Sequence, residues 1–469
     1  MGRSIYSPWP FVVLFFALVW FCQSNAFFWD TVQLSSKHAH WYYENHFSHF
    51  FLPNELDSGH PPTWGMYLAL CWQWFGQSLP VSHWAVFPFL TGICVFGFQL
   101  AENLRGARWA FAFLLLLCLD PVLLGQAALV SPDLALVCFF LMTLSGIFRE
   151  KRLLVLLGII GLCIISMRGM ITAFGLFLFV LSDACFLRHK RSFSDLFRSV
   201  WAFLPGGLLG LAFLIWHYIA VGWIGYHENS PWAESFSGVD FQGFIKNVAV
   251  IGWRFLDFGR LFLFLVAAGL LRYLWLHKQH PGKALARLAL LFVILLLVSL
   301  PGMLLHVGLS GHRYLLPLFI SLSLLLWYVL GAYPNQTLKN GALGLLVFAF
   351  LTGHFWIYPR NISQQWDATL AHIPYYGQRK EMILYLHSKE IPIESVGTVF
   401  PNAGPFMYRD LNGETTGFPL ADLDQQDYIY YSNVMNDFSD EELRRLFEEW
   451  ELVYRIGNWP VETCLFKRK

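Results

Sequence analysis

An apolar run, FVVLFFALVWFC (residues 11–22), leads into a polar loop, FFWDTVQLSSKHAHWYYENHFSHFFLPNELDSGHPP (residues 27–62). Asp30 follows the apolar run closely, and the loop contains five histidines: His38, His40, His46, His49 and His60. A carboxylate at the mouth of a membrane span is costly unless it is solvated, paired or used, so it is a functional candidate. Asp30 is therefore the first candidate catalytic residue, and the alternative is that it only marks the boundary with water.

The composition indicates a membrane protein. Hydrophobic residues make up 56% and charged residues 13% of the 469 residues, which excludes a soluble fold and favours an α-helical polytopic membrane protein. Residues 1–358 carry 21 Lys and Arg against 14 Asp and Glu, whereas residues 359–469 carry 11 against 17. We predict a transmembrane domain over residues 1–358 and an extracytoplasmic domain over residues 359–469.

The membrane topology follows from span length and charge. A helix needs roughly 20 apolar residues to cross a bilayer, and cytoplasmic loops are rich in Lys and Arg. These rules predict about eleven spans with a cytoplasmic N-terminus in the cell inner membrane, provided that residues 63–75 lie along the outer surface. The predicted spans are 9–26, 83–101, 109–128, 134–148, 153–167, 170–187, 199–220, 255–276, 288–308, 313–332 and 341–358.

The C-terminal domain has an alternating pattern typical of a small α/β fold. Ser439, three residues before Glu442, predicts the capped start of a helix. We predict helices over residues 379–389 and 439–450, and strands over residues 395–400, 427–431, 452–455 and 463–467.

The other outward loops hold isolated polar residues that are candidates for substrate contacts. They are Asp133 in SPD, Arg168 in SMRGM, and His312, Arg313 and Tyr314 at the start of a late span. For Arg168 there is an equal alternative to substrate contact: the residue lies at a helix end and only extends its charged group to the membrane interface.

A long aromatic loop, residues 221–252, is also predicted to face outward. A connection of this length without clear structure is usually functional. We therefore assign its polar pair, His227 and Glu228, to substrate binding.

The cysteines and histidines define no strong metal motif. Most of the eight cysteines lie in apolar runs without CxxC spacing, which indicates buried thiols. The pairs His38/His40 and His46/His49 leave a divalent metal open as a cofactor, although their spacings match no HExxH-type motif.

A set of motifs in chain order resembles the C-type glycosyltransferase (GT-C) fold. The set comprises Asp30 after the first span, HPP at residues 60–62, FG at residues 75–76, SPD at residues 131–133 and RYLLP at residues 313–317. More narrowly, residues 1–335 resemble the dolichyl-phosphate-mannose protein mannosyltransferases and the bacterial lipid A aminoarabinose transferases.

The resemblance implies transfer of a sugar from a polyprenyl-phosphate donor to a hydroxyl of a lipid or protein acceptor. It implies that Asp30 is the catalytic acid of the first loop, His60 the HPP histidine, and Asp133 the acid of the second loop. Arg313 with Tyr314 would contact the donor phosphate. The chain departs from the family at Thr31, where a second acid often follows the first.

The chemistry of such a transfer needs few groups. A carboxylate can remove the acceptor proton, and Arg can stabilise the leaving phosphate with paired donors. Inversion at the anomeric carbon needs one base, in contrast to the two carboxylates of a typical glycosidase. Asp30 and Arg313 supply this minimum set.

Two other classes of protein stay open. A transporter or flippase of a lipid-linked sugar would also place polar residues near its spans, but transporters favour midplane acids and repeated halves. A non-catalytic assembly factor would tolerate replacement of Asp30. In each case the partners are membrane lipids and no nucleic acid is expected.

The charge pattern predicts on which side of the membrane two positions of the chain lie. A reporter fused after Lys469 should be active outside the membrane and one fused after Arg152 should be active inside, because basic loops stay cytoplasmic. Paired fusions to an alkaline phosphatase and a fluorescent protein measure this, and the reverse pattern would contradict the outward-facing site.

Overall fold

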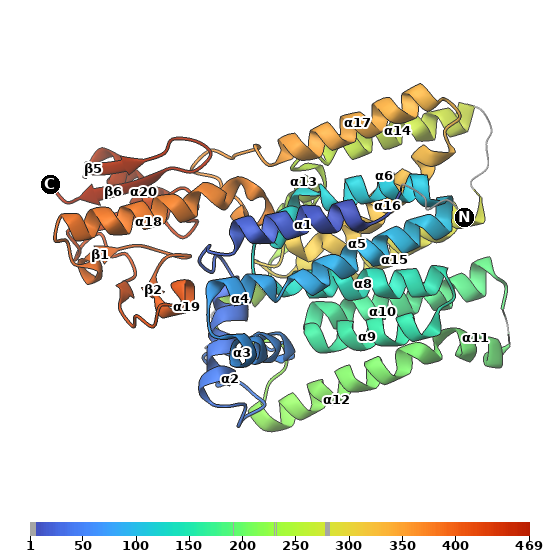
Figure 1. The fold of residues 1–469 in the computed structure, drawn as a ribbon, viewed down its shortest axis with the longest axis horizontal. Helices are drawn as coiled ribbons and strands as arrows, with labels where there is room; N and C mark the ends of the chain where they lie inside the picture. Colours follow the sequence, from blue (N-terminus) through green and yellow to red (C-terminus); the bar gives the residue numbers. More distant parts are fainter. Residues whose placement is uncertain (1–5, 191, 229, 231, 277–281) are drawn as a thin grey trace.

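The computed structural model of the chain describes residues 6–190, 192–228, 230, 232–276 and 282–469. Long helices lie side by side in a bundle, and a smaller domain of helices and strands formed by the C-terminal residues lies at one end of it (Figure 1). The predicted fold class, an α-helical membrane domain with a small C-terminal α/β domain, is confirmed. The predicted domain boundary at residues 358/359 stays a prediction.

The helices of the first part follow one another with short connections. In chain order they are α1 (Trp9–Cys22), α2 (His38–Glu44), α3 (Thr63–Phe75), α4 (Leu79–Trp84), α5 (Phe87–Arg105), α6 (Ala107–Cys118), α7 (Pro121–Ala127), α8 (Pro132–Phe148), α9 (Arg152–Ile165), α10 (Met167–Ser182), α11 (Phe193–Val200), α12 (Leu204–Val221), α13 (Phe241–Leu256), α14 (Leu261–Leu276), α15 (Lys283–Leu305), α16 (Leu316–Ala332) and α17 (Gln336–Gly353).

Many of these helices are suited to a bilayer. Among the described residues, five segments are long and apolar enough to cross it: Leu79–Arg105, Met167–Leu187, Phe193–Val221, Lys283–Leu305 and His312–Ala332. Helices α6 and α7 pass the same test together as a pair bent by 69°, and α1, α8, α9 and most of α14 are shorter apolar helices. The chain is thus an integral multi-pass membrane protein, while the count of about eleven spans stays a prediction.

Helix α3 lies apart from the long helices. It has 13 residues, fewer than a span needs, and lies with α2 and α4 at the end of the bundle nearest the C-terminal domain (Figure 1). This agrees with the expectation that residues 63–75 do not cross the membrane.

The loop predicted over residues 221–252 is shorter in the structure. Residues 241–252 belong to α13, which Asp240 caps by accepting a hydrogen bond from the Gly243 backbone N–H at 2.8 Å. The helix is amphipathic and contacts α15. A search for continuous apolar runs does not find this helix, because polar residues interrupt its apolar ones. The prediction of an unstructured loop was therefore wrong for these residues.

A buried ion pair holds the bend between α6 and α7. Asp120 caps α7 by accepting hydrogen bonds from the backbone N–H groups of Val122 and Leu123 at 2.9 and 3.2 Å. Its carboxylate also pairs with Arg260 Nη2 at 2.5 Å, and the Arg260 side chain is fully buried. Asp257, three residues before Arg260, instead accepts a hydrogen bond from His312 at 3.0 Å.

The C-terminal domain contains two small sheets. A four-stranded sheet has the order β1-β4-β6-β5, with β1 parallel to β4 and the other pairs antiparallel, and β2 pairs with β3. The elements are α18 (Ile373–Ser388), β1 (Val396–Gly397), β2 (Gly404–Pro405), α19 (Met407–Asp410), β3 (Gly417–Phe418), β4 (Tyr428–Ser432), α20 (Asp440–Glu448), β5 (Glu451–Ile456) and β6 (Thr463–Lys467).

Most elements of this domain were predictable. The second helix and the three later strands are confirmed within a few residues, and Ser439 and Glu442 form the predicted capping box. The first helix is confirmed too, but it begins at Ile373, six residues before the predicted start. Of the predicted strand over residues 395–400, only Val396 and Gly397 form a strand. Thr398, which follows, makes an isolated β-bridge with Leu420.

The two parts share a hydrophobic core. Phe28 and Trp29 of the first loop are buried among residues of the C-terminal domain, and the Phe28 ring stacks on His372 with centroids 5.0 Å apart. The Phe27 backbone N–H also donates to the Arg409 carbonyl at 2.9 Å. The C-terminal domain therefore fixes the position of the first loop, just before Asp30.

Removal of the buried carboxylate at the bend should destabilise the protein strongly. Asp120→Ala leaves the Arg260 guanidinium buried without its partner, and breaking such a pair costs about 3–5 kcal/mol. Thermal unfolding of the detergent-solubilised protein should show a clearly lower midpoint. The control is Arg444→Ala, which removes exposed ion pairs on α20 and should leave the midpoint unchanged. Equal midpoints for the two variants would contradict this role of the pair.

Candidate active site

Asp30 lies in a tightly held turn between α1 and a π-helical segment, Val32–Lys37. Trp29 just before it has a φ of 56°, a left-handed conformation that is rare for a bulky residue and is often found at functional sites. Thr31 donates its hydroxyl to the Phe28 carbonyl at 2.6 Å and accepts from the Phe28 N–H at 3.1 Å. Thr31 therefore closes the turn, and no second acid of the first loop stands beside Asp30.

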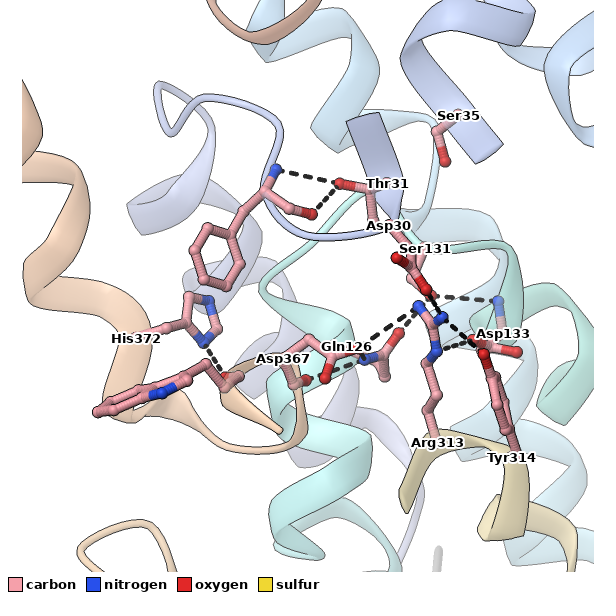
Figure 2. Close-up of polar contacts among 12 residues, drawn as sticks. Asp30, Thr31, Ser35, Gln126, Ser131, Asp133, Arg313, Tyr314, Asp367 and His372 are labelled. Carbon is pink, nitrogen blue, oxygen red and sulfur yellow. Dashed lines mark hydrogen bonds and ion pairs between the residues drawn. The ribbon is translucent and has the colours of Figure 1, made fainter. Parts of the chain in front are cut away.

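Arg313 is the centre of the site. Its guanidinium is 5% exposed and donates a hydrogen bond from Nη2 to Asp30 Oδ2. Two more carboxylates lie near it: Asp367 Oδ2 at 3.4 Å from Nη1 and Asp133 Oδ2 at 3.9 Å from Nε. Figure 2 shows the three acids around the guanidinium, each from a different part of the chain.

A second arginine fixes Asp133. Arg168 Nη1 lies 2.7 Å from Asp133 Oδ1, and its guanidinium stands over the Tyr314 ring at 4.4 Å from the centroid. The Tyr314 hydroxyl accepts a hydrogen bond from Arg313 Nη2 at 3.2 Å. Four of the residues named from the sequence, Asp133, Arg168, Arg313 and Tyr314, thus form one cluster with Asp30.

Sequence analysis missed Asp367. It lies in a short turn after α17, and its side chain is 1% exposed. Gln126 of α7 donates from Nε2 to the Asp367 carbonyl at 2.9 Å and to its Oδ2 at 3.2 Å. Ser131, whose hydroxyl donates to Gln126 Oε1 at 2.5 Å, also accepts from the Asp133 N–H at 3.2 Å. This network, visible in Figure 2, connects Asp367 to Asp133.

The surroundings of Asp367 change its acidity. Burial raises the pKa of this carboxyl from 3.8 to about 6, and the negative charges of Asp30 and Asp133 act in the same direction. The Arg313 guanidinium and the Gln126 hydrogen bond oppose the increase only in part. Asp367 therefore changes its charge near pH 6, beside the group that would bind a phosphate.

A cavity of about 230 Å³ opens onto this cluster. It is lined by polar groups of the site, Asp30, His60, Arg168, Arg313 and Tyr314, and by apolar residues of α10, α15 and the α12–α13 connection. The lining combines charged groups with a mostly apolar wall. Such a combination suits a molecule with a polar end and a lipid chain.

His60 borders the cavity as a neutral group. Burial lowers its pKa to about 3, and the positive charges of Arg168 and Arg313 contribute to the decrease. Its Nδ1 atom is buried and has no hydrogen-bond partner among the described residues. The loop before it is anchored by Asp57, which accepts from His217 at 3.0 Å and from the Gly59 N–H at 2.8 Å. His60 can offer a hydrogen bond there but is too weakly basic to act as a general base.

Three residues named from the sequence lie outside the cavity lining. His312 is buried and hydrogen-bonded to Asp257, which also accepts from the Tyr358 hydroxyl. His227 contacts the Asn54 carbonyl at 2.7 Å, and Glu228 is exposed on the same connection. The structure thus holds His312 on Asp257 away from the cavity, and substrate contacts of His312, His227 and Glu228 stay predictions.

No group of three or more His, Cys, Asp and Glu side chains suited to a metal ion occurs within the described residues. The histidine pairs of the first loop do not converge: His38 contacts the Leu56 carbonyl at 2.8 Å and His40 the Ser36 carbonyl at 2.8 Å. The three carboxylates of the site face the Arg313 guanidinium, which already supplies positive charge there. These residues do not fit a resident divalent metal.

The raised pKa of Asp367 predicts a pH-dependent effect of its replacement. The folded wild-type protein favours the protonated carboxyl, so its stability falls as pH rises from about 4 through 6, by about 3 kcal/mol for a shift of roughly two units. The Asp367→Asn variant does not lose stability in this way, because an asparagine side chain does not ionise. Its thermal midpoint relative to wild type should therefore be higher at pH 7.5 than at pH 4.5.

The control for this measurement is Asp427→Asn, which replaces an exposed carboxylate of the same domain. Its midpoint relative to wild type should differ little between the two pH values. A difference between Asp367→Asn and wild type that stays constant with pH would show that the buried carboxyl does not titrate in this range.

Comparison with known proteins bears on the fold. No protein-family model and no curated protein sequence matches the chain. Among solved structures, the chain is similar to ArnT from Cupriavidus metallidurans bound to undecaprenyl phosphate, at 12% sequence identity and a TM-score of 0.55. The match covers 97% of this chain and 98% of that chain. The resemblance found in the sequence is thus confirmed for the architecture, and the chain has the GT-C fold of ArnT.

Proposed function

We propose that the protein is a membrane glycosyltransferase that moves a hexosyl or pentosyl group from a polyprenyl-phosphate donor to a hydroxyl of a lipid or protein acceptor. The observation that carries this proposal is the contact between Arg313 and Asp30 at a cavity with a largely apolar wall. A group able to bind a phosphate would then lie beside a candidate base. The ArnT structure of the same fold holds undecaprenyl phosphate, which supports a lipid-phosphate donor.

Arg313 would bind the donor phosphate by exchanging partners. Its guanidinium is buried and contacts three carboxylates, and a phosphate offers the same kind of acceptor with more charge. The neighbouring Arg168 borders the same cavity and is 21% exposed, so it can approach the phosphate without losing Asp133. Binding of the donor would then release Asp30 from Arg313.

Asp30 would act as the base once it is released. Its side chain is 17% exposed, more than that of Asp133 or Asp367, and it borders the cavity. The acceptor proton passes to Asp30, the acceptor oxygen bonds to the anomeric carbon, and the bond from that carbon to the phosphate oxygen breaks. The polyprenyl phosphate leaves on Arg313, and the configuration at the anomeric carbon is inverted.

The remaining residues would position the reactants. Asp133 is held by Arg168 and by its backbone bond to Ser131, so it can orient the acceptor or the two arginines. His60 is neutral and can donate a hydrogen bond to the sugar. We place the site at the outer face of the cell inner membrane with the N-terminus inside, as the distribution of basic loops predicts.

Replacement of Asp30 tests the proposal. Asp30→Asn removes the proton acceptor but keeps the size of the side chain, so transfer should slow by about a hundred- to ten-thousand-fold. Binding of undecaprenyl phosphate should be at least as tight as in wild type, because Arg313 then contacts one charged carboxylate fewer. Asp133→Asn should reduce transfer less, since Asp133 is not the base.

Two measurements are needed. Mass spectrometry of the glycosylated lipids and proteins of cells that carry each variant reports transfer, and titration of the purified proteins with undecaprenyl phosphate reports binding. Near-normal transfer by Asp30→Asn would show that another carboxylate is the base. The absence of any glycosylated product from wild type, together with movement of a lipid-linked sugar between leaflets, would favour a transporter instead.

A further inference from the structure

The end of the bundle farthest from the C-terminal domain contains two adjoining pockets that the proposed transfer does not use. Helix α11 lies at this end (Figure 1). One pocket, of about 330 Å³, is bordered by charged residues, and the other, of about 450 Å³, is almost entirely apolar. Trp201 and Phe203 border both pockets. The two form one site with a polar end and an apolar end.

The charged pocket has an excess of unpaired positive groups. Asp183 is paired with Arg188 and Arg287, each at 3.0 Å, and Glu150 is paired with Arg188 at 3.2 Å. Among the described residues, the other three basic side chains of the pocket make no ion pair, and only one unpaired acid, Asp195, faces them. These three are Arg152, Lys190 and Arg198. An anionic group is the complement of this pocket.

The apolar pocket has the shape of a groove along the bundle. It lies between α9, α10 and α12 and reaches from Leu204 to Leu214 on α12, a length of about 15 Å at the rise of an α-helix. Gly207 borders the groove, and a Cβ atom at this position would meet no atom within 4 Å. The groove is therefore open where a side chain would otherwise fill it, with room for a hydrocarbon chain.

Helix α11 gives the site the geometry of a membrane interface. Its Phe193 and Phe197 side chains are 83% and 52% exposed and lie on one face, with ring centroids 6.4 Å apart. Asp195 and Arg198 of the same helix border the charged pocket. A short amphipathic helix of this kind lies at the level of the lipid headgroups, with its aromatic face in the acyl region.

We infer that this site binds an anionic membrane phospholipid in the leaflet opposite the catalytic cavity. Arg152, Lys190 and Arg198 contact its phosphate, and one acyl chain lies in the groove beside Gly207. The inference is independent of the glycosyl transfer, because none of these residues borders the catalytic cavity.

Lipid titration of the delipidated full-length protein, followed by native mass spectrometry, tests the inference. The probes are phosphatidylglycerol and phosphatidylcholine with identical palmitoyl and oleoyl chains. Wild type should bind the first phosphatidylglycerol much more tightly than phosphatidylcholine. The attraction of one basic side chain to an anionic lipid is worth roughly a fivefold change in affinity. The triple variant Arg152→Gln/Lys190→Gln/Arg198→Gln should therefore bind phosphatidylglycerol on the order of a hundredfold more weakly.

A matched variant separates the site from general charge attraction. Arg108→Gln/Lys151→Gln/Lys283→Gln removes the same charge through three exposed basic residues that border neither pocket. This control should change the affinity for phosphatidylglycerol by less than threefold. An equal loss in both triple variants, or no loss in the first, would overturn the inference, as would equal binding of the two lipids by wild type.

A second pair of variants tests the groove. Gly207→Leu fills the groove without a backbone clash and should weaken the binding of phosphatidylglycerol with long chains at least tenfold, while dihexanoyl-phosphatidylglycerol is affected less. Gly269→Leu is the control, since a Cβ atom there also meets no atom within 4 Å but the residue lies on α14, outside the groove. Unchanged binding of long-chain phosphatidylglycerol by Gly207→Leu would show that no acyl chain lies in the groove.

Discussion

The burial of one guanidinium organises the functional part of this molecule. A buried positive charge is tolerated only when carboxylates and hydrogen-bond acceptors replace the water that it has lost. Arg313 meets this condition with acids from three distant parts of the chain: the first loop, the start of α8 and the turn after α17. The elements that carry these acids must therefore keep fixed positions relative to the start of α16. The shared core around Phe28 and Trp29 does this for the first loop.

The same constraint explains how the proposed base and the proposed phosphate-binding group are held side by side. In the structure Asp30 and Arg313 satisfy each other, and Asp133 is shared with Arg168. Asp367 adds a third negative group whose pKa lies near 6. The net charge of the cluster therefore depends on the protonation of Asp367.

The sequence predicted most of this site but could not predict all of it. Asp30, Asp133, Arg168 and Arg313 were identifiable because each is an isolated charge at the edge of an apolar run, where a charge without a role is costly. Asp367 has no such signal, since it lies in a polar stretch after the last helix of the bundle, and Gln126, its partner, lies 241 residues away in sequence. His312 is adjacent to Arg313, but it is hydrogen-bonded to Asp257 and lies outside the cavity lining, so its role in binding stays a prediction. Helix α13 was missed because Gln242, Lys246, Asn247 and Arg254 interrupt its apolar residues, while the fold class followed directly from composition.

The order of the site residues along the chain has a consequence for biosynthesis. A ribosome delivers Asp30 and Asp133 to the membrane long before residue 313 exists, so until then Asp30 lacks its cation and Asp133 can pair only with Arg168. When Arg313 arrives it finds two acids already in place, and the third comes only with residue 367, after the last helix of the bundle. A nascent chain that stops just before residue 367 has every long helix of the bundle. It lacks both Asp367 and the residues of the C-terminal domain that surround Phe28. Assembly of the charge cluster therefore waits for residues beyond the last helix of the bundle, and a chain truncated before residue 367 lacks one of its three acids.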